Sequence, residues 1–199
     1  MRKGEMTRQR IIEEAAPIFN QRGFAGCSMQ DVMAATGLEK GGLYRHFATK
    51  EELAVEAFRY AVSRSVRTKS EGLDEVEGAV NKLRHLIQQF VESPSRIPGG
   101  CPLMNTAVDA DDGNEVLRGL AREGIAEWRE RLVKIITTGM RAGEIRRDTV
   151  PRRLANTLIS TVEGALMISR LEGTKTALKD AQTVLEVVLE SLGAEVAAH

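Results

Sequence analysis

Apolar residues recur three and four positions apart along almost the whole chain, which is the spacing of one face of an α-helix. The first such stripe predicts a helix from Thr7 to Arg22 and consists of Ile11, Ala15, Ile18 and Phe19. Thr7 is a suitable N-cap for this helix, and Gly23 stands where a helix end favours a left-handed residue.

Shorter patterns follow this first helix. A second helix opens at Ser28, and Asp31 three residues later forms a variant of a capping box. The turn Thr36-Gly37-Leu38 ends that helix, and a short helix over 39–47 comes next. Thr49 with Glu52 is a second capping box and opens a helix with the apolar face Leu53, Ala57, Tyr60 and Ala61. Short helices joined by a tight glycine turn outline a helix-turn-helix.

Longer apolar stripes occupy the rest of the chain. They predict helices over 76–93, 116–142, 151–173 and 174–192, the second with Gly119 and Gly124 as points where it would bend or break. Pro102 suits the first turn of a further helix after a loop over 98–102, and 109–113 is expected to be a solvated acidic turn. About nine helices predict an all-α protein, with an N-terminal three-helix domain followed by a helical bundle.

The composition is that of a soluble globular protein. Of 199 residues, 42% are hydrophobic and 28% charged, which excludes a disordered tail. No apolar run approaches the roughly 18 to 20 residues of a membrane span, and no apolar stretch follows the first charged residues as in a signal peptide. Cys27 and Cys101 make no disulfide framework. These observations predict a cytoplasmic protein that does not associate with membranes.

The zero net charge of the chain conceals an asymmetry. Residues 1–69 contain 12 Lys and Arg against 8 Asp and Glu, whereas the remaining residues contain 16 against 20. By itself a basic segment of this size is typical of a solvated helical face. Its meaning depends on the motif that lies within it.

The segment from Ser28 to Leu53 carries that motif. Its distinctive parts are Thr36-Gly37-Leu38, Lys40-Gly41, Leu43-Tyr44, His46-Phe47 and Lys50-Glu51-Glu52-Leu53. In this combined spacing the segment resembles the DNA-binding domain of the tetracycline-repressor (TetR) family of bacterial transcription regulators. The match covers about residues 7–60, and the rest of the chain fits the family's ligand-binding and dimerisation domain in length and helix count.

The chemistry of the short helix over 39–47 agrees with a recognition helix. Gly41 and Gly42 remove side-chain bulk at a helix-propensity cost of about 1 kcal/mol each, which a backbone that approaches DNA can use. Lys40 and Arg45 supply positive charge for phosphates or guanine edges, and Tyr44 supplies a hydroxyl. Leu43 and Phe47 are expected to face inward and to pack on Val32 and Phe24.

The resemblance implies a set of DNA-contacting residues. Lys40 and Gly42 would lie at base edges, and Tyr44 and Lys50 at phosphates; the full set is Thr7, Ser28, Lys40, Gly41, Gly42, Leu43, Tyr44, Arg45, His46 and Lys50. Many members of the family carry Ser or Thr where Glu39 stands. Glu39 either caps the helix, which we favour, or accepts a hydrogen bond from cytosine. His46 is expected to have a structural role as well.

The resemblance also divides the chain into functional parts. Residues 1–48 would form the DNA-binding domain with its motif over 28–47, residues 49–69 a connecting helix, and residues 70–199 the effector-binding and dimerisation domain. The two last long helices would form the homodimer interface. The regulator would leave an operator with inverted-repeat symmetry when a small effector, whose identity the sequence does not specify, binds the C-terminal domain.

The segment from Gly99 to Ala107 resembles a subgroup of the family that has a Gly-Cys-Pro-Leu-x-Asn element. Cys101 stands at a helix N-terminus, where a thiol is either a reactive sensor or a small buried side chain. We favour the interpretation as a small buried side chain. Short polar groups and large apolar side chains suggest an effector pocket made by Cys101, Met104, Asn105, Trp128 and Met167.

No arrangement of residues indicates an enzyme. The histidines His46, His85 and His199 are scattered, and there is neither a phosphate-binding glycine loop nor a Gly-x-Ser-x-Gly turn. We therefore expect no catalytic residue, no metal site and no cofactor. The alternatives to a repressor are an activator and a helical binding module that has lost DNA recognition. Glu39 and the zero net charge support the binding module.

Overall fold

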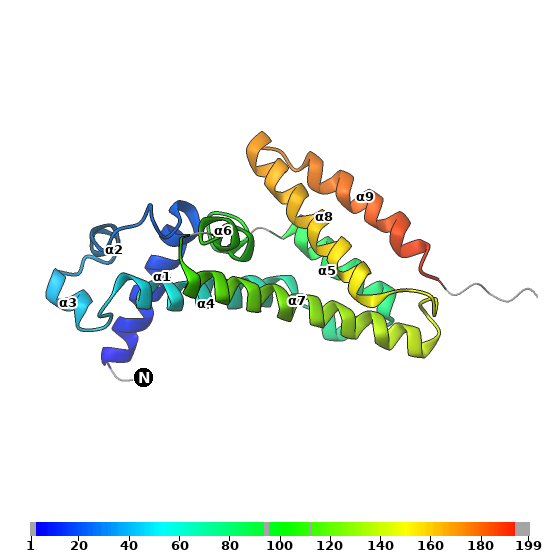
Figure 1. Cartoon of the computed structure of the whole chain (residues 1–199), viewed down its shortest axis with the longest axis horizontal. Coiled ribbons are helices and arrows are strands. Elements are labelled where there is room, and N and C mark those ends of the chain that lie inside the picture. The colour runs from blue at the N-terminus through cyan, green and yellow to red at the C-terminus, as the bar shows by residue number, and fades with distance from the viewer. Residues whose placement is uncertain (1–2, 94–95, 112, 194–199) are drawn as a thin grey trace, which may run out of the picture. The chain divides into compact units, whose positions relative to one another are not determined.

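The computed structural model describes residues 3–93, 96–111 and 113–193, and within these ranges it contains nine α-helices and one 3-10 turn (Figure 1). This confirms the predicted all-α fold and helix number. In chain order the elements are α1 (Lys3–Arg22), α2 (Met29–Thr36), α3 (Lys40–Tyr44), α4 (Lys50–Lys69), η1 (Leu73–Glu75), α5 (Ala79–Glu92), α6 (Pro102–Asp109), α7 (Glu115–Ala142), α8 (Pro151–Glu172) and α9 (Thr176–Glu190).

The chain divides into two compact units. The N-terminal unit comprises residues 1–67 and 95–124, and the C-terminal unit comprises residues 68–94 and 125–199. The segment with α6 and the start of α7 thus packs with α1 and α4 of the N-terminal unit, although the sequence interpretation assigned everything beyond residue 69 to the effector domain. The functional division itself stays a prediction.

The core of the N-terminal unit joins α1 to the three helices that follow it. Its fully buried side chains have no exposed surface and include Ile11, Ala15, Val32, Leu43, Phe47 and Leu53. Burial of each large apolar side chain contributes about 1.5–3 kcal/mol. Because α3 has only five residues, it depends on this core for its helical conformation.

Two helix starts differ from the sequence prediction. Helix α1 begins at Lys3, four residues before Thr7, whose hydroxyl donates to the Lys3 carbonyl oxygen at 3.1 Å. Thr7 is therefore not the N-cap: the residues before it carry no apolar stripe that would mark a helix. Helix α5 begins at Ala79, because Val76 and Gly78 adopt non-helical conformations.

Helix α7 runs unbroken over 28 residues, so the bend considered at its glycines does not occur. Packing against α6 explains why residue 124 is a glycine. A Cβ atom there would lie 2.4 Å from Cδ2 of Leu103 in α6, which approaches the bare α7 backbone. At Gly119 a Cβ atom would meet nothing within 4 Å.

In the C-terminal unit, α8 packs along α9, and α5 packs on both (Figure 1). The core consists of one stripe from each helix and includes Leu83, Ile87, Leu132, Ile136, Leu154, Leu158, Leu185 and Leu189. Most of the apolar stripes that predicted these helices thus face this core, whereas Ile168 of the α8 stripe is 42% exposed.

Side chains from elsewhere in the C-terminal unit cap both ends of α5. At its start, the Glu144 carboxylate accepts the Ala79 N–H at 2.5 Å, in place of a cap from Gly78. At its end, the Lys69 ammonium donates to three carbonyl oxygens at 2.7–3.2 Å, and Lys175 donates to two more at 3.1 Å. Cations at the negative end of a helix dipole stabilise it.

Candidate nucleic-acid interface

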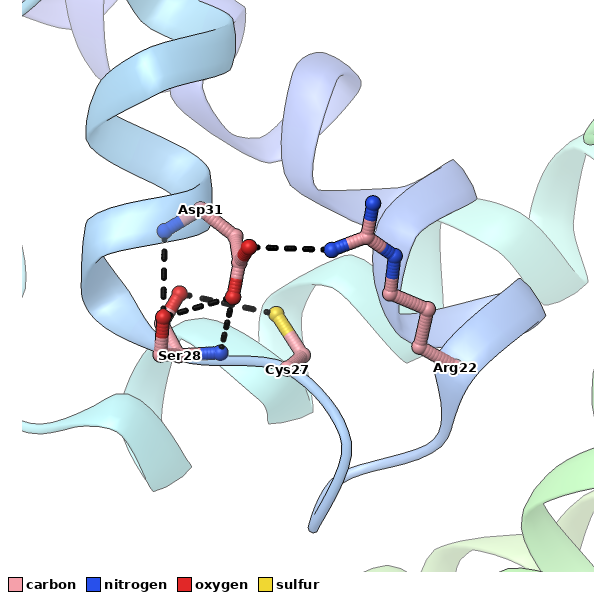
Figure 2. A network of polar contacts seen from close by, with 4 residues as sticks. All are labelled: Arg22, Cys27, Ser28 and Asp31. Carbon is pink, nitrogen blue, oxygen red and sulfur yellow. Dashed lines mark hydrogen bonds and ion pairs between the residues drawn. The ribbon is translucent and has the colours of Figure 1, made fainter.

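Helix α2 is started by reciprocal hydrogen bonds between Ser28 and Asp31 (Figure 2). The Asp31 N–H donates to Ser28 Oγ at 3.1 Å, and the Asp31 carboxylate accepts the Ser28 N–H at 2.7 Å, which confirms the predicted capping box. Arg22, at the end of α1, donates to the other oxygen of that carboxylate at 2.9 Å. Gly37, at φ +67°, ends α2 by donating its N–H to the Met33 carbonyl. The helix before α3 is thus fixed at both ends.

The same network occupies both donors of Ser28. Its hydroxyl donates to the Asp31 carboxylate at 2.5 Å, and its backbone N–H donates to the same oxygen. A DNA phosphate requires a donor, so in this conformation Ser28 serves the start of α2. The predicted DNA contact of Ser28 would require its hydroxyl to leave Asp31.

Cys27 lies beside this network with its side chain buried (Figure 2). Its thiol contacts the Ser28 carbonyl oxygen at 3.7 Å. Burial, reinforced by the negative charge of Asp31, raises the pKa of the Cys27 thiol. Because the thiolate is the reactive form, Cys27 is a structural residue.

The network makes the stability of the N-terminal unit depend on pH. The hydrogen bonds from Ser28 and the neighbouring Arg22 guanidinium hold the pKa of Asp31 below its ordinary value. A lowered pKa contributes stability above the ordinary carboxyl pKa of about 4, and the contribution is lost as the pH falls through the lowered value. We therefore expect the Asp31→Asn variant to be less stable than the parent protein at pH 7. This difference in stability should be smaller at pH 3. Urea unfolding followed by circular dichroism at both pH values measures this, and an equal difference at both would contradict it.

Leu43 and Phe47 anchor α3 to the core. Both side chains have no exposed surface, and the Arg8 guanidinium lies 4.6 Å from the centroid of the Phe47 ring. The predicted inward orientation is confirmed, and so is packing in one cluster with Val32, whereas Phe24 belongs to a different cluster. Leu43 is also among the predicted DNA-contacting residues; its apolar side chain is buried and holds α3 in place, so a contact with DNA, which stays a prediction, would involve its backbone.

The opposite face of α3 is open and basic. Lys40, Tyr44 and Arg45 are exposed, and the Lys40 ammonium lies 5.9 Å from the centroid of the Tyr44 ring one helical turn away. A Cβ atom at Gly41 would meet nothing within 4 Å, and one at Gly42 would make ordinary contact with Leu38 at 3.7 Å. Neither glycine has a positive φ. Packing within the chain therefore does not require either glycine.

Glu39 occupies the N-cap position of α3, but its side chain makes no capping hydrogen bond. The favoured interpretation of Glu39 as a capping side chain is therefore wrong. A glutamate side chain is longer than the Ser, Thr, Asp and Asn side chains that reach back to the first backbone N–H groups. Glu39 is exposed and directly precedes Lys40.

Lys50 is the first residue of α4, and its ammonium lies 4.2 Å from the centroid of the Phe24 ring. The hydroxyl of Thr49 accepts the Glu52 N–H at 3.0 Å, as the second predicted capping box requires. The reciprocal bond goes to a neighbour: the Glu52 carboxylate accepts the N–H of Ala48 at 2.9 Å. A cation held at a helix N-terminus is well placed for a phosphate, since the first N–H groups attract the same anion.

The predicted DNA-binding residues thus separate into two groups. Lys40, Gly41, Gly42 and Tyr44 lie on α3 with Arg45 directly after it, and Lys50 begins α4. Thr7 and Ser28 use their hydroxyls as donors inside the protein, and His46 is half-buried directly after α3. Their contacts with DNA stay predictions.

The predicted effector residues are not gathered in either unit. Cys101, Met104 and Asn105 belong to the N-terminal unit, and Trp128 and Met167 to the C-terminal unit. Met167 is 48% exposed, so the prediction that it helps to enclose a cavity is not supported within its own unit. Trp128 stacks on Phe90 with ring centroids 5.8 Å apart. Cys101 is buried, which agrees with its interpretation as a small buried side chain.

Asn105 has a structural role that the sequence did not indicate. Its amide group donates to the carbonyl oxygens of Asn20 and Gly99 at 3.0 and 2.8 Å. The Asn20 amide donates in turn to the carbonyl oxygens of Pro98 and Gly100 at 2.8 and 3.2 Å. The two side chains fasten the loop before α6 to the end of α1.

Asp109 is the other residue whose role sequence reasoning missed. It ends α6, and its carboxylate accepts the Phe24 N–H at 2.6 Å. The expectation of a purely solvated acidic turn is therefore wrong at Asp109, while Asp112 of that turn lies outside the described residues. The local pattern identifies Gly23 as a helix end but cannot show that Asp109, 85 positions after Phe24, lies against this turn.

Apolar side chains are also exposed on the last two long helices. Met167, Ile168 and Leu171 of α8 and Val184 and Val187 of α9 are between 42% and 81% exposed. Scattered apolar side chains are common on surfaces, but a group of this kind on two adjacent helices is typical of an interaction face.

Two further properties of the described residues concern other kinds of site. Among the described residues, no helix is long and apolar enough to cross a membrane. Residues 3–93, 96–111 and 113–193 also contain no group of three or more His, Cys, Asp or Glu side chains placed to hold a metal ion.

Comparison with known proteins agrees with this arrangement. Residues 11–57 match the family described as "Bacterial regulatory proteins, tetR family", and residues 79–185 match "Tetracyclin repressor-like, C-terminal domain". The HTH-type transcriptional repressor DhaR of Mycobacterium sp. (strain GP1) is 31% identical over 186 residues, which are 93% of this chain and 91% of DhaR.

Solved structures show the same fold. A TetR transcriptional regulator from Chloroflexus aurantiacus J-10-FL superposes with a TM-score of 0.92 at 42% identity, covering 97% of this chain and 98% of that chain. A cysteine mutant of the TetR-family regulator CifR, in complex with 26-base-pair double-strand operator DNA, has a TM-score of 0.79 at 20% identity and covers 92% and 95% of the two chains. The chain belongs to the TetR family of bacterial transcriptional regulators.

Proposed function

We propose that this protein is a sequence-specific, DNA-binding transcriptional repressor that recognises its operator through α3. The observation that carries the proposal is the two-sided character of this helix: Leu43 and Phe47 fix one face in the core, and the other presents Lys40, Tyr44 and Arg45 around a bare backbone. A short helix held in this way can enter a major groove about 12 Å wide. Lys40 would reach base edges, and Tyr44 and Lys50 would bind phosphates.

The proposed operator is an inverted repeat bound by a homodimer. The exposed apolar side chains of α8 and α9 support an isologous interface, in which each helix pair faces its copy. Two copies of α3 would then contact successive major grooves about 34–36 Å apart on one face of the duplex.

The C-terminal unit would bind the effector that releases the protein from DNA. This requires that the effector prefer the conformation that does not bind DNA. The Gly-Cys-Pro-Leu-x-Asn element supports assignment to a subgroup of the family, with Cys101 before the first residue of α6 and Asn105 in the middle of this helix as structural residues. Such a regulator would act in the cytoplasm, where it reaches DNA, and would have no enzymatic activity.

The Gly41→Ala variant tests separately what residue 41 contributes to the stability of α3 and to operator binding. Alanine should stabilise α3 by about 1 kcal/mol, because its Cβ atom meets open space and its helix propensity exceeds that of glycine. If the bare backbone approaches DNA, the same methyl group should weaken operator binding about tenfold, the scale of one lost base contact. Urea unfolding and fluorescence anisotropy with an operator recovered by selection measure the two effects.

Gly119→Ala is the matched control for this variant. Gly119 is also helical and open, but it lies on α7, so the substitution should raise stability and leave operator affinity within twofold. If Gly41→Ala also left the operator affinity unchanged, the proposal that α3 contacts DNA would be contradicted.

A further inference from the structure

The side chain of Lys50 is held by an aromatic ring. Its ammonium lies 4.2 Å from the centroid of the Phe24 ring, although Phe24 lies in the turn between α1 and α2, and Lys50 begins α4. An ammonium above a ring face is attracted by the ring quadrupole. Because an ammonium has three N–H donors and the ring covers only one side of it, donors remain for an anion.

Phe24 has one ring contact and one backbone contact besides the contact with Lys50. It stacks on Phe19, with ring centroids 6.4 Å apart and planes inclined by 13°. The Phe24 backbone is fixed by its N–H bond to the Asp109 carboxylate at the end of α6. The approach is so close that a Cβ atom at Gly23, which has φ +73°, would lie 2.3 Å from Asp109 Oδ1. The turn before α2 therefore requires glycine at this position.

Helix α6 is fixed to the same end of α1 by a second set of contacts. The Asn105 amide donates to the Asn20 carbonyl oxygen, and the Asn20 amide donates to two carbonyl oxygens of the loop before α6. Asn105 lies in the middle of α6 and Asp109 at its end. The position of α6 thereby determines where the Phe24 backbone lies.

We propose that Phe24 is a positioning residue for DNA binding: its ring, fixed from α6 by Asp109, holds the Lys50 ammonium in place for a DNA phosphate. The proposal rests on the proposed function, in which Lys50 binds a phosphate. A lysine side chain loses rotamer freedom when it binds an anion, and a side chain already held against a ring loses less. Phe24 thus acts through Lys50 and touches no DNA.

A double-mutant cycle of Phe24→Leu and Lys50→Met tests this proposal. Leucine keeps an apolar side chain but has no ring quadrupole, and methionine keeps the Lys50 stem without its charge. We expect Phe24→Leu to weaken operator binding about three- to fivefold for each subunit of the proposed homodimer, the scale of one cation–π contact. Lys50→Met should weaken it further and lower the slope of log K against log salt by about 1.8, the value for two phosphates, one per subunit. In the Lys50→Met background, Phe24→Leu should change the affinity less than twofold.

The outcomes of the cycle separate the possible failures. Additive effects of the two substitutions, or tighter binding by Phe24→Leu, would overturn the proposal. An unchanged salt slope in Lys50→Met would show that Lys50 binds no phosphate, which overturns the proposal while operator binding by the parent protein still supports α3 as the recognition element. A parent protein that binds no operator would overturn the proposed function itself.

Phe19→Leu is the control for the loss of packing. It removes the ring stacked on Phe24 but leaves the contact with Lys50, so the melting temperature should fall while the affinity of the folded protein stays within twofold. Asp109→Ala should behave like Phe24→Leu, including its loss of effect in the Lys50→Met background. A loss of affinity in Phe19→Leu as large as in Phe24→Leu would mean that Phe24 acts through stability alone.

A measurement without DNA tests the first step directly. Protons that lie above an aromatic ring resonate upfield, so the Lys50 Cε protons should show a ring-current shift in the NMR spectrum of the full chain. We expect Phe24→Leu to abolish the shift and Asp109→Ala to reduce it, with Phe19→Leu as the control that retains it. An ordinary Lys50 resonance in the parent protein would overturn the proposal whatever the protein binds.

Discussion

Replacing Phe47 with alanine is expected to destabilise the N-terminal unit by about 3–5 kcal/mol, the range for a large aromatic side chain lost from a core. Phe47 has no exposed surface, and the Arg8 guanidinium rests on its ring. Since domains have only about 5–15 kcal/mol of stability, the substitution removes a large share of it, and the unfolded fraction of this unit should rise at 37 °C. Operator binding should be lost with the fold, because α3 is too short to persist alone.

Phe47→Leu keeps most of the buried volume and serves as the control. It should cost about 1 kcal/mol and leave the protein folded and able to bind its operator. Urea unfolding followed by far-UV circular dichroism measures both variants. A Phe47→Ala protein as stable as the parent would contradict the assignment of Phe47 to the centre of this core.

Replacing Gly99 with alanine should have a comparable effect through the backbone. Gly99 has φ +109°, a conformation that residues with a Cβ atom rarely adopt, and that atom would lie 2.8 Å from the Asn20 carbonyl oxygen. Backbone strain and forced displacement together should cost about 2–5 kcal/mol. The displaced loop would also separate the Gly99 carbonyl from the Asn105 amide that donates to it.

The same glycine-to-alanine change at Gly119 should have the opposite sign. Gly119 is helical with open space around it, so alanine should raise the free energy of unfolding by about 1 kcal/mol. Thermal and urea unfolding of both variants provide the comparison. A stable Gly99→Ala protein would show that the loop before α6 does not lie against α1 as described.

Local patterns predicted those parts of the fold that local contacts determine. The apolar stripes identified the helices, and the Ser28–Asp31 capping box and the Gly37 helix end were confirmed. Thr7 failed as an N-cap because the helix continues into residues without an apolar stripe. The prediction for Glu39 failed because Glu39 occupies the N-cap position of α3 but its side chain makes no capping hydrogen bond.

The candidate site was predictable only as far as it lies on one short segment. Lys40, Gly41 and Tyr44 lie within five residues of one another on α3, and their spacing alone places them on one face of the helix. The contacts of Asp109 with Phe24 and of Asn105 with Asn20 each join residues 85 positions apart. Neither periodicity nor spacing reveals such pairs, and the same limit explains why Asn105 was interpreted as part of an effector pocket.

Selection of bound DNA from a random duplex library is the most direct test of the central claim. It should use refolded protein freed of small molecules, at physiological salt, with the dimer mass checked in parallel and Lys40→Ala selected beside it. We predict enrichment of an inverted repeat with half-site centres about 10 base pairs apart, and an altered preference for Lys40→Ala. A folded, dimeric, ligand-free protein that enriches no sequence would contradict the account and favour a binding module that has lost DNA recognition.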